Sequence, residues 1–125
     1  MKDLIFTKVF KDNTVTLIID CSINKVNNDL IVDLRGNLNT YNSYDTILDD
    51  FKKINLTKYN NVYLDIANLE KIASSNLRFM YDLLDILSKS IPITIIYKNM
   101  YMKKLSTIIL STLEKTKVQY IQKGE

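Results

Sequence analysis

Two adjacent serines, Ser74 and Ser75, are the residues whose type and position point most directly to chemistry. They lie where a strand-like segment passes into a helical pattern, so one hydroxyl can cap the free N–H groups of that helix. A phosphate on Ser75 would also be stabilised there, because the dipole and free amides of a helix N-terminus favour negative charge. It would change the charge and shape of the surface without unfolding the protein. The pair therefore has two interpretations, a structural cap and a phosphorylation switch.

The residue types of the commonest catalytic sites are missing. The sequence has no histidine, which excludes Ser-His and Cys-His nucleophile pairs and removes the commonest zinc ligand. The single cysteine, Cys21, cannot form an intrachain disulfide. Because it follows an apolar run that ends at Asp20, we predict a partly buried structural thiol rather than a nucleophile. We therefore expect no catalytic residue, no metal ligand and no enzymatic activity.

The carboxylates and glycines add no second site. Asp49 and Asp50 are adjacent on a predicted helix, where their side chains point about 100° apart, so we interpret them as part of a solvated face. Asp65 lies in a strand predicted to be buried, as a hydrogen-bonded structural carboxylate or an organiser of the next loop. Gly36 and Gly124 are the only glycines and lie too far apart to form a phosphate-binding loop, so we expect no cofactor.

Hydrophobic periodicity predicts an α/β fold that positions the serine pair. An opening hairpin is expected, with a turn at residues 11–13, followed by a strand that Gly36 ends. Asn42 is predicted to cap the first helix and Asn99 the third, while the second helix begins at about Ser75. Strands that alternate with helices after the hairpin imply a mostly parallel second half. The predicted strands are residues 4–10, 14–20, 30–35, 62–66, 93–97 and 117–121, and the second helix covers residues 75–89.

Length and composition favour a single domain over residues 1–125. The chain is 46% hydrophobic and has too few glycines and prolines for a disordered linker. No apolar stretch is long enough to span a membrane, and one unpaired cysteine suits the cytoplasm. From Lys89 onward there are seven lysines and two glutamates, a basic region without arginine. We interpret this region as a solvated surface and expect neither nucleic-acid binding nor membrane insertion.

Three segments together resemble the STAS domain of bacterial anti-sigma factor antagonists. Residues 34–40, LRGNLNT, resemble the family pattern L-x-G-x-L-D-T. Residues 62–69, VYLDIANL, resemble V-x-L-D-L-S-x-L, and residues 72–77, IASSNL, lie where the family has I-D-S-S-G-L. The order and spacing of the elements agree with this family from about Leu4 to Ile121. The resemblance implies a STAS-like mixed β-sheet with an N-terminal hairpin and about three packed helices.

The resemblance also implies a function. In the family, the second serine of the motif is phosphorylated by a partner serine kinase that is also the anti-sigma factor. A phosphatase removes the phosphate, and for this chain the resemblance implies one of the PP2C type. The unphosphorylated domain binds this partner, and phosphorylation weakens the binding. The serine in question corresponds to Ser75, with Ser74 beside it. The corresponding docking surface would comprise Asn39, Ala73, Asn76, Arg78 and Phe79.

The chain departs from the family pattern at three of these positions. Ala73 and Asn39 stand where the family has Asp, and Asn76 stands where it has Gly. Asn tolerates a left-handed backbone better than most residues, so the turn can survive the third change. The alternative function is a STAS-like accessory subunit that stabilises a larger complex, such as a lipid-transport ATPase, without phosphorylation. The apolar residues Phe79, Leu83 and Ile86 would suit its permanent interface.

Overall fold

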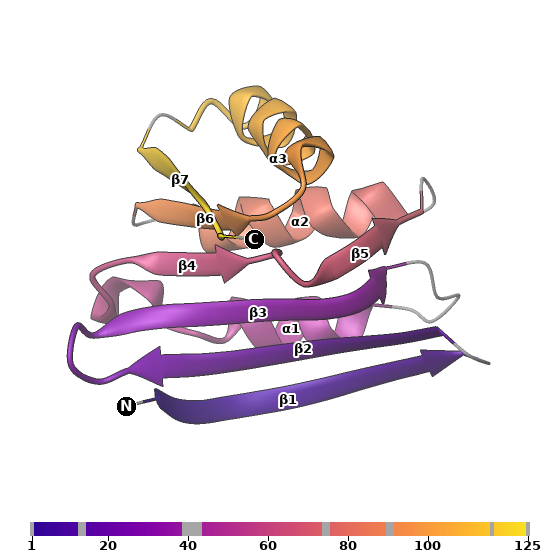
Figure 1. Cartoon of the computed structure of the whole chain (residues 1–125). Coiled ribbons are helices and arrows are strands. Elements are labelled where there is room, and N and C mark those ends of the chain that lie inside the picture. Colours follow the sequence, from indigo (N-terminus) through magenta and orange to yellow (C-terminus); the bar gives the residue numbers. More distant parts are fainter. Residues whose placement is uncertain are drawn as a thin grey trace.

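The strands of the chain form one mixed β-sheet (Figure 1). The structure is a computed structural model, and it describes residues 2–12, 15–38, 44–73, 76–89, 92–115 and 117–124. The strand order is β1-β2-β3-β4-β6-β7, and β5 pairs with β3 beyond the end of β4. The strands are β1 (Lys2–Asp12), β2 (Val15–Asn24), β3 (Asp29–Leu38), β4 (Val62–Asp65), β5 (Leu69–Ile72), β6 (Ile93–Tyr97) and β7 (Val118–Gln122). The helices are α1 (Asp45–Lys52), α2 (Leu77–Leu87), α3 (Met100–Thr112) and the short 3-10 helix Leu56–Lys58.

The first three strands are antiparallel and longer than predicted. The hairpin is confirmed, because β1 pairs with β2 from Lys2↔Asn24 to Asp12↔Val15. The predicted turn at residues 11–13 is partly wrong, since Lys11 and Asp12 belong to β1, while Asn13 lies outside the described residues. The register shifts between Leu4 and Phe6 at a bulge. These three long strands pair along most of their length, and the parallel half of the sheet is added to the edge of β3.

Gly36 does not end its strand, contrary to the prediction. Its φ of 101° is a left-handed value that side chains rarely adopt, and β3 continues through it to Leu38. A Cβ at this position would collide with the backbone carbonyl of Thr16 on β2. Glycine therefore lets β3 remain against β2 while its pairing with β5 shifts register.

The second half of the sheet is parallel, as predicted. β4 pairs with β3 and β6, and β6 pairs with β7, all in parallel. β5, which the hydrophobic pattern does not predict, pairs in parallel with residues 36–38 of β3. β3 runs beyond the last residue of β4, Asp65, and β5 occupies the edge that β4 leaves free. The chain thus reaches Ala73 and the serine pair directly from a strand.

Two of the three predicted helix starts can be compared with the structure. Asn99 caps α3 as predicted, since its side-chain oxygen accepts a hydrogen bond of 2.7 Å from the Tyr101 amide. α1 begins at Asp45, and the predicted cap Asn42 lies outside the described residues. α2 begins at Leu77, with Asn76 in the N-cap position, two residues after the predicted start.

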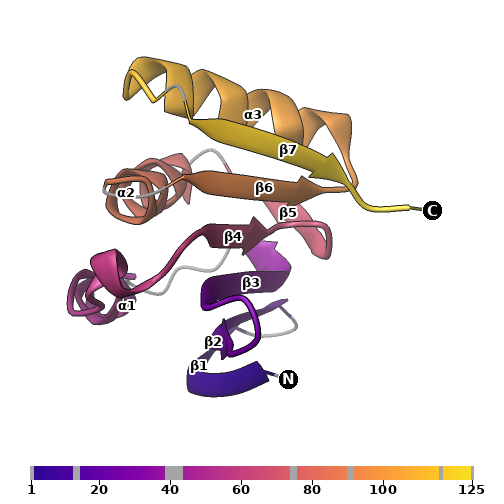
Figure 2. The same ribbon diagram turned by 90° about the vertical axis from the view of Figure 1, so that its left-hand side faces the viewer.

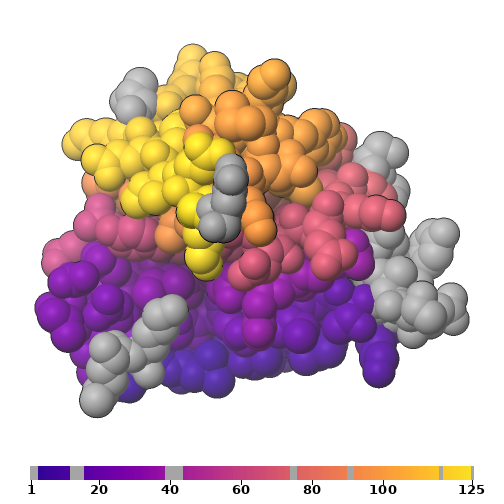
Figure 3. Space-filling view, viewed as in Figure 1, coloured from indigo at the N-terminus to yellow at the C-terminus, as the bar shows by residue number. Residues whose placement is uncertain are grey.

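α1 and α2 lie against one face of the sheet (Figure 2), and α3 packs beside β6 and α2. The opposite face is turned toward the viewer in Figures 1 and 3 and is not covered by α1 or α2. None of the described helices has the length and apolar composition needed to cross a membrane.

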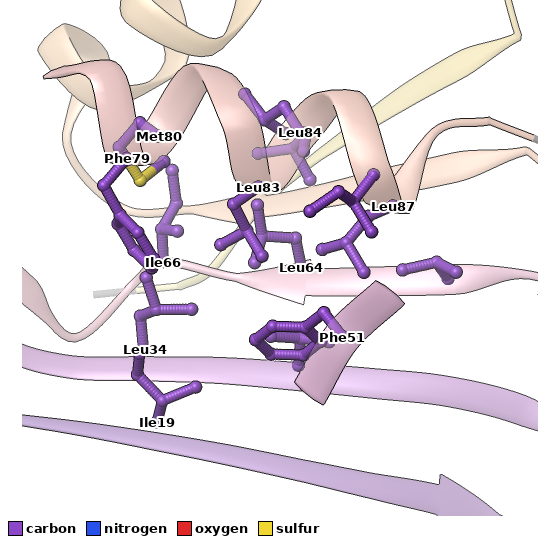
Figure 4. Close-up of a cluster of buried hydrophobic side chains, with 14 of the residues drawn as sticks. Ile19, Leu34, Phe51, Leu64, Ile66, Phe79, Met80, Leu83, Leu84 and Leu87 are labelled. Carbon is purple, nitrogen blue, oxygen red and sulfur yellow. The ribbon is translucent and has the colours of Figure 1, made fainter. Parts of the chain in front are cut away.

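The core fills the layer between the sheet and the helices (Figure 4). Leu64 of β4, Phe51 of α1 and Leu83 of α2 are all fully buried and point into this layer. Phe6 of β1 adds an edge-to-face ring contact with Phe51 at 5.2 Å. This packing fixes α2, and with it the segment that carries the candidate site.

Candidate functional site

The candidate site is the junction between β5 and α2. The Ala73 amide donates to the Leu38 carbonyl at 3.0 Å, and the Asn76 amide donates to the Ala73 carbonyl at 2.8 Å. These bonds hold the described residues on both sides of the serine pair against the end of β3. Ser74 and Ser75 themselves lie outside the described residues, as does Asn39. Of the predicted site residues, the structure therefore describes Ala73, Asn76, Arg78 and Phe79.

Asn76 occupies the N-cap position of α2 without capping the helix. Its side chain makes no cap hydrogen bond, and α2 has no acidic residue in its first turn. The residue is 8% exposed, and its Oδ1 is buried without a hydrogen-bond partner. A buried acceptor without a donor is unfavourable, and among the described residues no side chain caps the first turn of α2 or offsets the positive end of its dipole. This end of α2 therefore favours a negative group that can accept its free amides.

Arg78 and Phe79 are adjacent in the sequence but differ completely in exposure. The Arg78 side chain is 82% exposed and pairs with Asp82 at 3.0 Å, one turn along α2. Phe79 is 4% exposed, and its ring lies 4.6 Å from that of Tyr44 in the core. Arg78 can contact a partner or a phosphate, whereas Phe79 holds α2 in place.

A groove that the sequence does not predict adjoins this junction. One cavity of about 600 Å³ lies at the ends of β4 and β6, and a second of about 370 Å³ continues from it along β5 to Ala73. The two cavities share Glu70 and Asn99. The groove was missed because it depends on β5, a four-residue strand with two charged residues that resembles a loop in sequence.

A row of charged residues crosses the uncovered face of the sheet. Asp20 of β2, Asp33 of β3 and Asp65 of β4 are neighbours in register. Arg35 pairs with Asp20 at 2.6 Å and lies 3.5 Å from Asp33, while Lys123 lies 3.6 Å from Asp65. Burial, followed by the charge of Asp65, raises the pKa of Asp33, although Arg35 opposes the shift. The two cations do not fully offset the repulsion among the three carboxylates, which lie directly opposite one another on neighbouring strands.

Asp65 organises a loop, one of the two roles predicted for it. Its Oδ1 accepts a hydrogen bond of 2.9 Å from the Ala67 amide, just after the end of β4. Among the described residues, no group of three His, Cys, Asp or Glu side chains is arranged to hold a metal ion. Asp65 thus holds the start of the loop in which Ala67 lines the groove.

Cys21 is a structural residue, as predicted, and its burial is complete. Its exposed fraction is 0%, and burial raises the pKa of its thiol to about 12. A thiol in this state contains almost no thiolate at neutral pH, so it cannot act as a nucleophile there.

Comparisons with known proteins identify the fold. No family model and no curated protein matches the sequence. Among solved structures, apo-SiaC from Pseudomonas aeruginosa superposes with a TM-score of 0.59 at 15% sequence identity, over 96% of this chain and 100% of the SiaC chain. At this identity the likeness concerns the fold alone. The chain has the α/β fold of that structure, and the predicted mixed sheet with an N-terminal hairpin and three packed helices is confirmed.

Proposed function

We propose that this protein is a regulatory protein-binding module of the anti-sigma-antagonist kind, which acts in the cytoplasm as a single STAS-like domain without catalysing a reaction. The observation that carries the proposal is the start of α2, which follows the serine pair in the sequence: Asn76 makes no cap hydrogen bond there, the first turn has no acidic residue, and Arg78 is exposed. The STAS-like fold supports it, because this fold serves partner binding in the family that the sequence resembles. The proposed partner is a serine kinase that is also an anti-sigma factor.

Phosphorylation of Ser75 is the proposed regulation. A phosphoserine carries about −1.5 to −2 charges at neutral pH and three strong acceptor oxygens. The first turn of α2 has neither an acidic residue nor a side-chain cap from Asn76 to compete with such a group. Arg78 can approach it once its bond to Asp82 is exchanged. The phosphate would then reverse the charge of the surface that the partner reads, and a PP2C-type phosphatase would restore it.

The switch is tested with two variants of Ser75 and one control. Ser75→Asp is expected to weaken capture of the native kinase partner by about tenfold or more, whereas Ser75→Ala binds it constitutively. Ser111→Asp introduces the same charge on the exposed surface of α3 and should bind as the wild type does. Equal binding by Ser75→Asp and wild type would rule out the switch.

The modification itself can be located by mass spectrometry. Trypsin cleaves after Lys71 and Arg78, so both serines lie on one peptide of residues 72–78. We expect a phosphate on Ser75 whose occupancy differs between growing and stressed native cells. A peptide that stays unmodified under both conditions would indicate a constitutive binder.

The alternative, an accessory subunit of a lipid-transport ATPase, loses part of its support in the structure. Phe79, Leu83 and Ile86 were the apolar residues suited to a permanent interface. All three are buried within the protein, with exposed fractions of 4%, 0% and 7%. They stabilise the fold and are not available to a second subunit. The burial of Phe79 also removes it from the docking surface predicted for the regulatory module, but that surface retains the exposed Arg78, so we favour the regulatory module.

A further inference from the structure

β5 has a free edge that faces the groove. It pairs with β3 along one edge and with no other strand in the described part of the chain. β6, the strand that follows β4 in the sheet order, ends at Tyr97, and the chain then turns into α3 instead of continuing beside β5. Figure 3 shows the face on which α3 (orange) lies above β5 (salmon). The sheet thus lacks one strand between β5 and the first turn of α3, and unpaired strand edges are templates for further pairing.

The walls of the groove combine apolar side chains with positive charge. Met102 and the half-buried Ile72 line it, and Tyr101 at its rim is 57% exposed. Lys71 and Lys98 line it as well, and neither forms an ion pair with any described residue. Glu70 is the one carboxylate among the lining residues.

The first turn of α3 strengthens this positive potential. It has no acidic residue, and it begins at the groove, where Asn99, Tyr101 and Met102 are lining residues. A carboxylate entering the groove would meet two unpaired lysines and the positive end of a thirteen-residue helix. The apolar wall would at the same time exclude water from its flanking residues.

We propose that the groove receives an extended, acidic segment of the partner protein, which adds as a strand to the free edge of β5. Alternate side chains of the segment would pack on Ile72 and Tyr101, and a carboxylate would lie near Lys98. Because Ala73 lines the groove, the segment would contact the residue that directly precedes the serine pair in the sequence. This inference rests on the proposed function only in assigning the segment to the same partner.

The test uses peptides in place of the unidentified partner. Random twelve-residue peptides displayed on phage, about the length of the longest strand here, are selected on the purified full chain. The best peptide is then synthesised with a fluorescent label, and its affinity is measured by anisotropy. We expect the selected peptides to share an Asp or Glu flanked by alternating apolar residues. Lys98→Glu should weaken binding by about tenfold or more.

A matched control separates the groove from general charge. Lys104→Glu makes the same charge change on an exposed residue of α3 that does not line the groove, and should alter affinity by less than about twofold. N-methylation of alternate backbone amides should abolish binding in one register and spare the other, because only every second amide of an added strand faces β5. Equal losses in both lysine variants, no dependence on register, or no selected peptide would overturn the inference.

The outcomes also distinguish this inference from the proposed function. Peptides that depend on Lys98, together with native partner capture that ignores Ser75→Asp, would support the groove and refute the switch. A partner that responds to Ser75→Asp but binds Lys98→Glu as tightly as wild type would refute the groove and support the switch.

Discussion

Position 36 imposes two requirements that only glycine, among the amino-acid types, can meet. Its φ of 101° lies in the left-handed region, and the Thr16 carbonyl occupies the space where a Cβ would lie. Gly36→Ala is therefore expected to lower the free energy of unfolding by about 2–5 kcal/mol, measured by urea denaturation. Gly124→Ala is the control, because nothing lies within 4 Å of an added Cβ there, and its unfolding midpoint should equal that of the wild type. A Gly36→Ala variant as stable as Gly124→Ala would contradict the strain.

Asp33 makes stability depend on pH in an unusual direction. Burial and the neighbouring Asp65 raise the pKa of Asp33, so its ionised form is disfavoured in the folded state. Its contribution to stability is present below the unfolded pKa of about 3.9 and is lost as pH rises through the higher folded pKa. Asp33→Asn should therefore be more stable than wild type at pH near 7, and the difference should vanish near pH 3.

Urea midpoints of Asp33→Asn and wild type at both pH values test this sign. Asp49→Asn is the matched control, since the Asp49 side chain is 67% exposed and its removal should leave stability unchanged at either pH. A less stable Asp33→Asn variant at neutral pH would show that the pairing of Asp33 with Arg35 outweighs its burial.

At the scale of elements, α2 separates residues that hold the fold from residues that can meet a partner. Phe79 contacts Tyr44 in the core, whereas Arg78 is largely exposed. Phe79→Ala should cost about 3–5 kcal/mol of stability. Arg78→Ala should change the unfolding midpoint little, because an exposed ion pair of this kind contributes about 0.3–0.5 kcal/mol. Thermal unfolding of both variants measures the difference, and two equally mild losses would contradict the burial of Phe79.

The elements that could be predicted are those with a strong local signal. Asn99 was identified as a cap because Asn favours that position, and the apolar run of β6 indicated a buried strand. β5 could not be predicted, because its pairing depends on how far β3 extends beyond β4, which is a tertiary relation. The same reason applies to Gly36: a glycine usually ends a strand pattern, whereas the pairing of Gly36 with Leu17 of β2, a tertiary relation, keeps it inside β3.

The position of the candidate site was predictable in part. Ala73, Asn76 and Arg78 were located by the family pattern, and the structure places them at one junction. The burial of Phe79 could not be deduced, since an aromatic residue at the start of a helix can face either the core or solvent. The groove also escaped prediction, because its walls come from β5 and α3, which are distant in the sequence.

At the scale of the whole molecule, Cys21 reports on global unfolding. It is the only cysteine, lies fully buried in β2, and its thiol pKa is about 12. A maleimide should therefore label the folded protein at least about a thousandfold more slowly than the urea-unfolded protein. Wild type and Ser111→Cys are compared by mass spectrometry, and the added exposed thiol should react at once. Rapid labelling of Cys21 in the native protein would indicate local opening of β2.

The strand order also has a consequence for biosynthesis. Apart from β5, the order of the strands across the sheet is their order in the sequence, so each new strand pairs with the strand last added. β5 joins β3 later without separating strands that are already paired. No strand has to insert between two others, so the sheet can grow at one edge while the chain leaves the ribosome. The antiparallel pairing of β1, β2 and β3 is the most local, and it would be complete before α2 is synthesised.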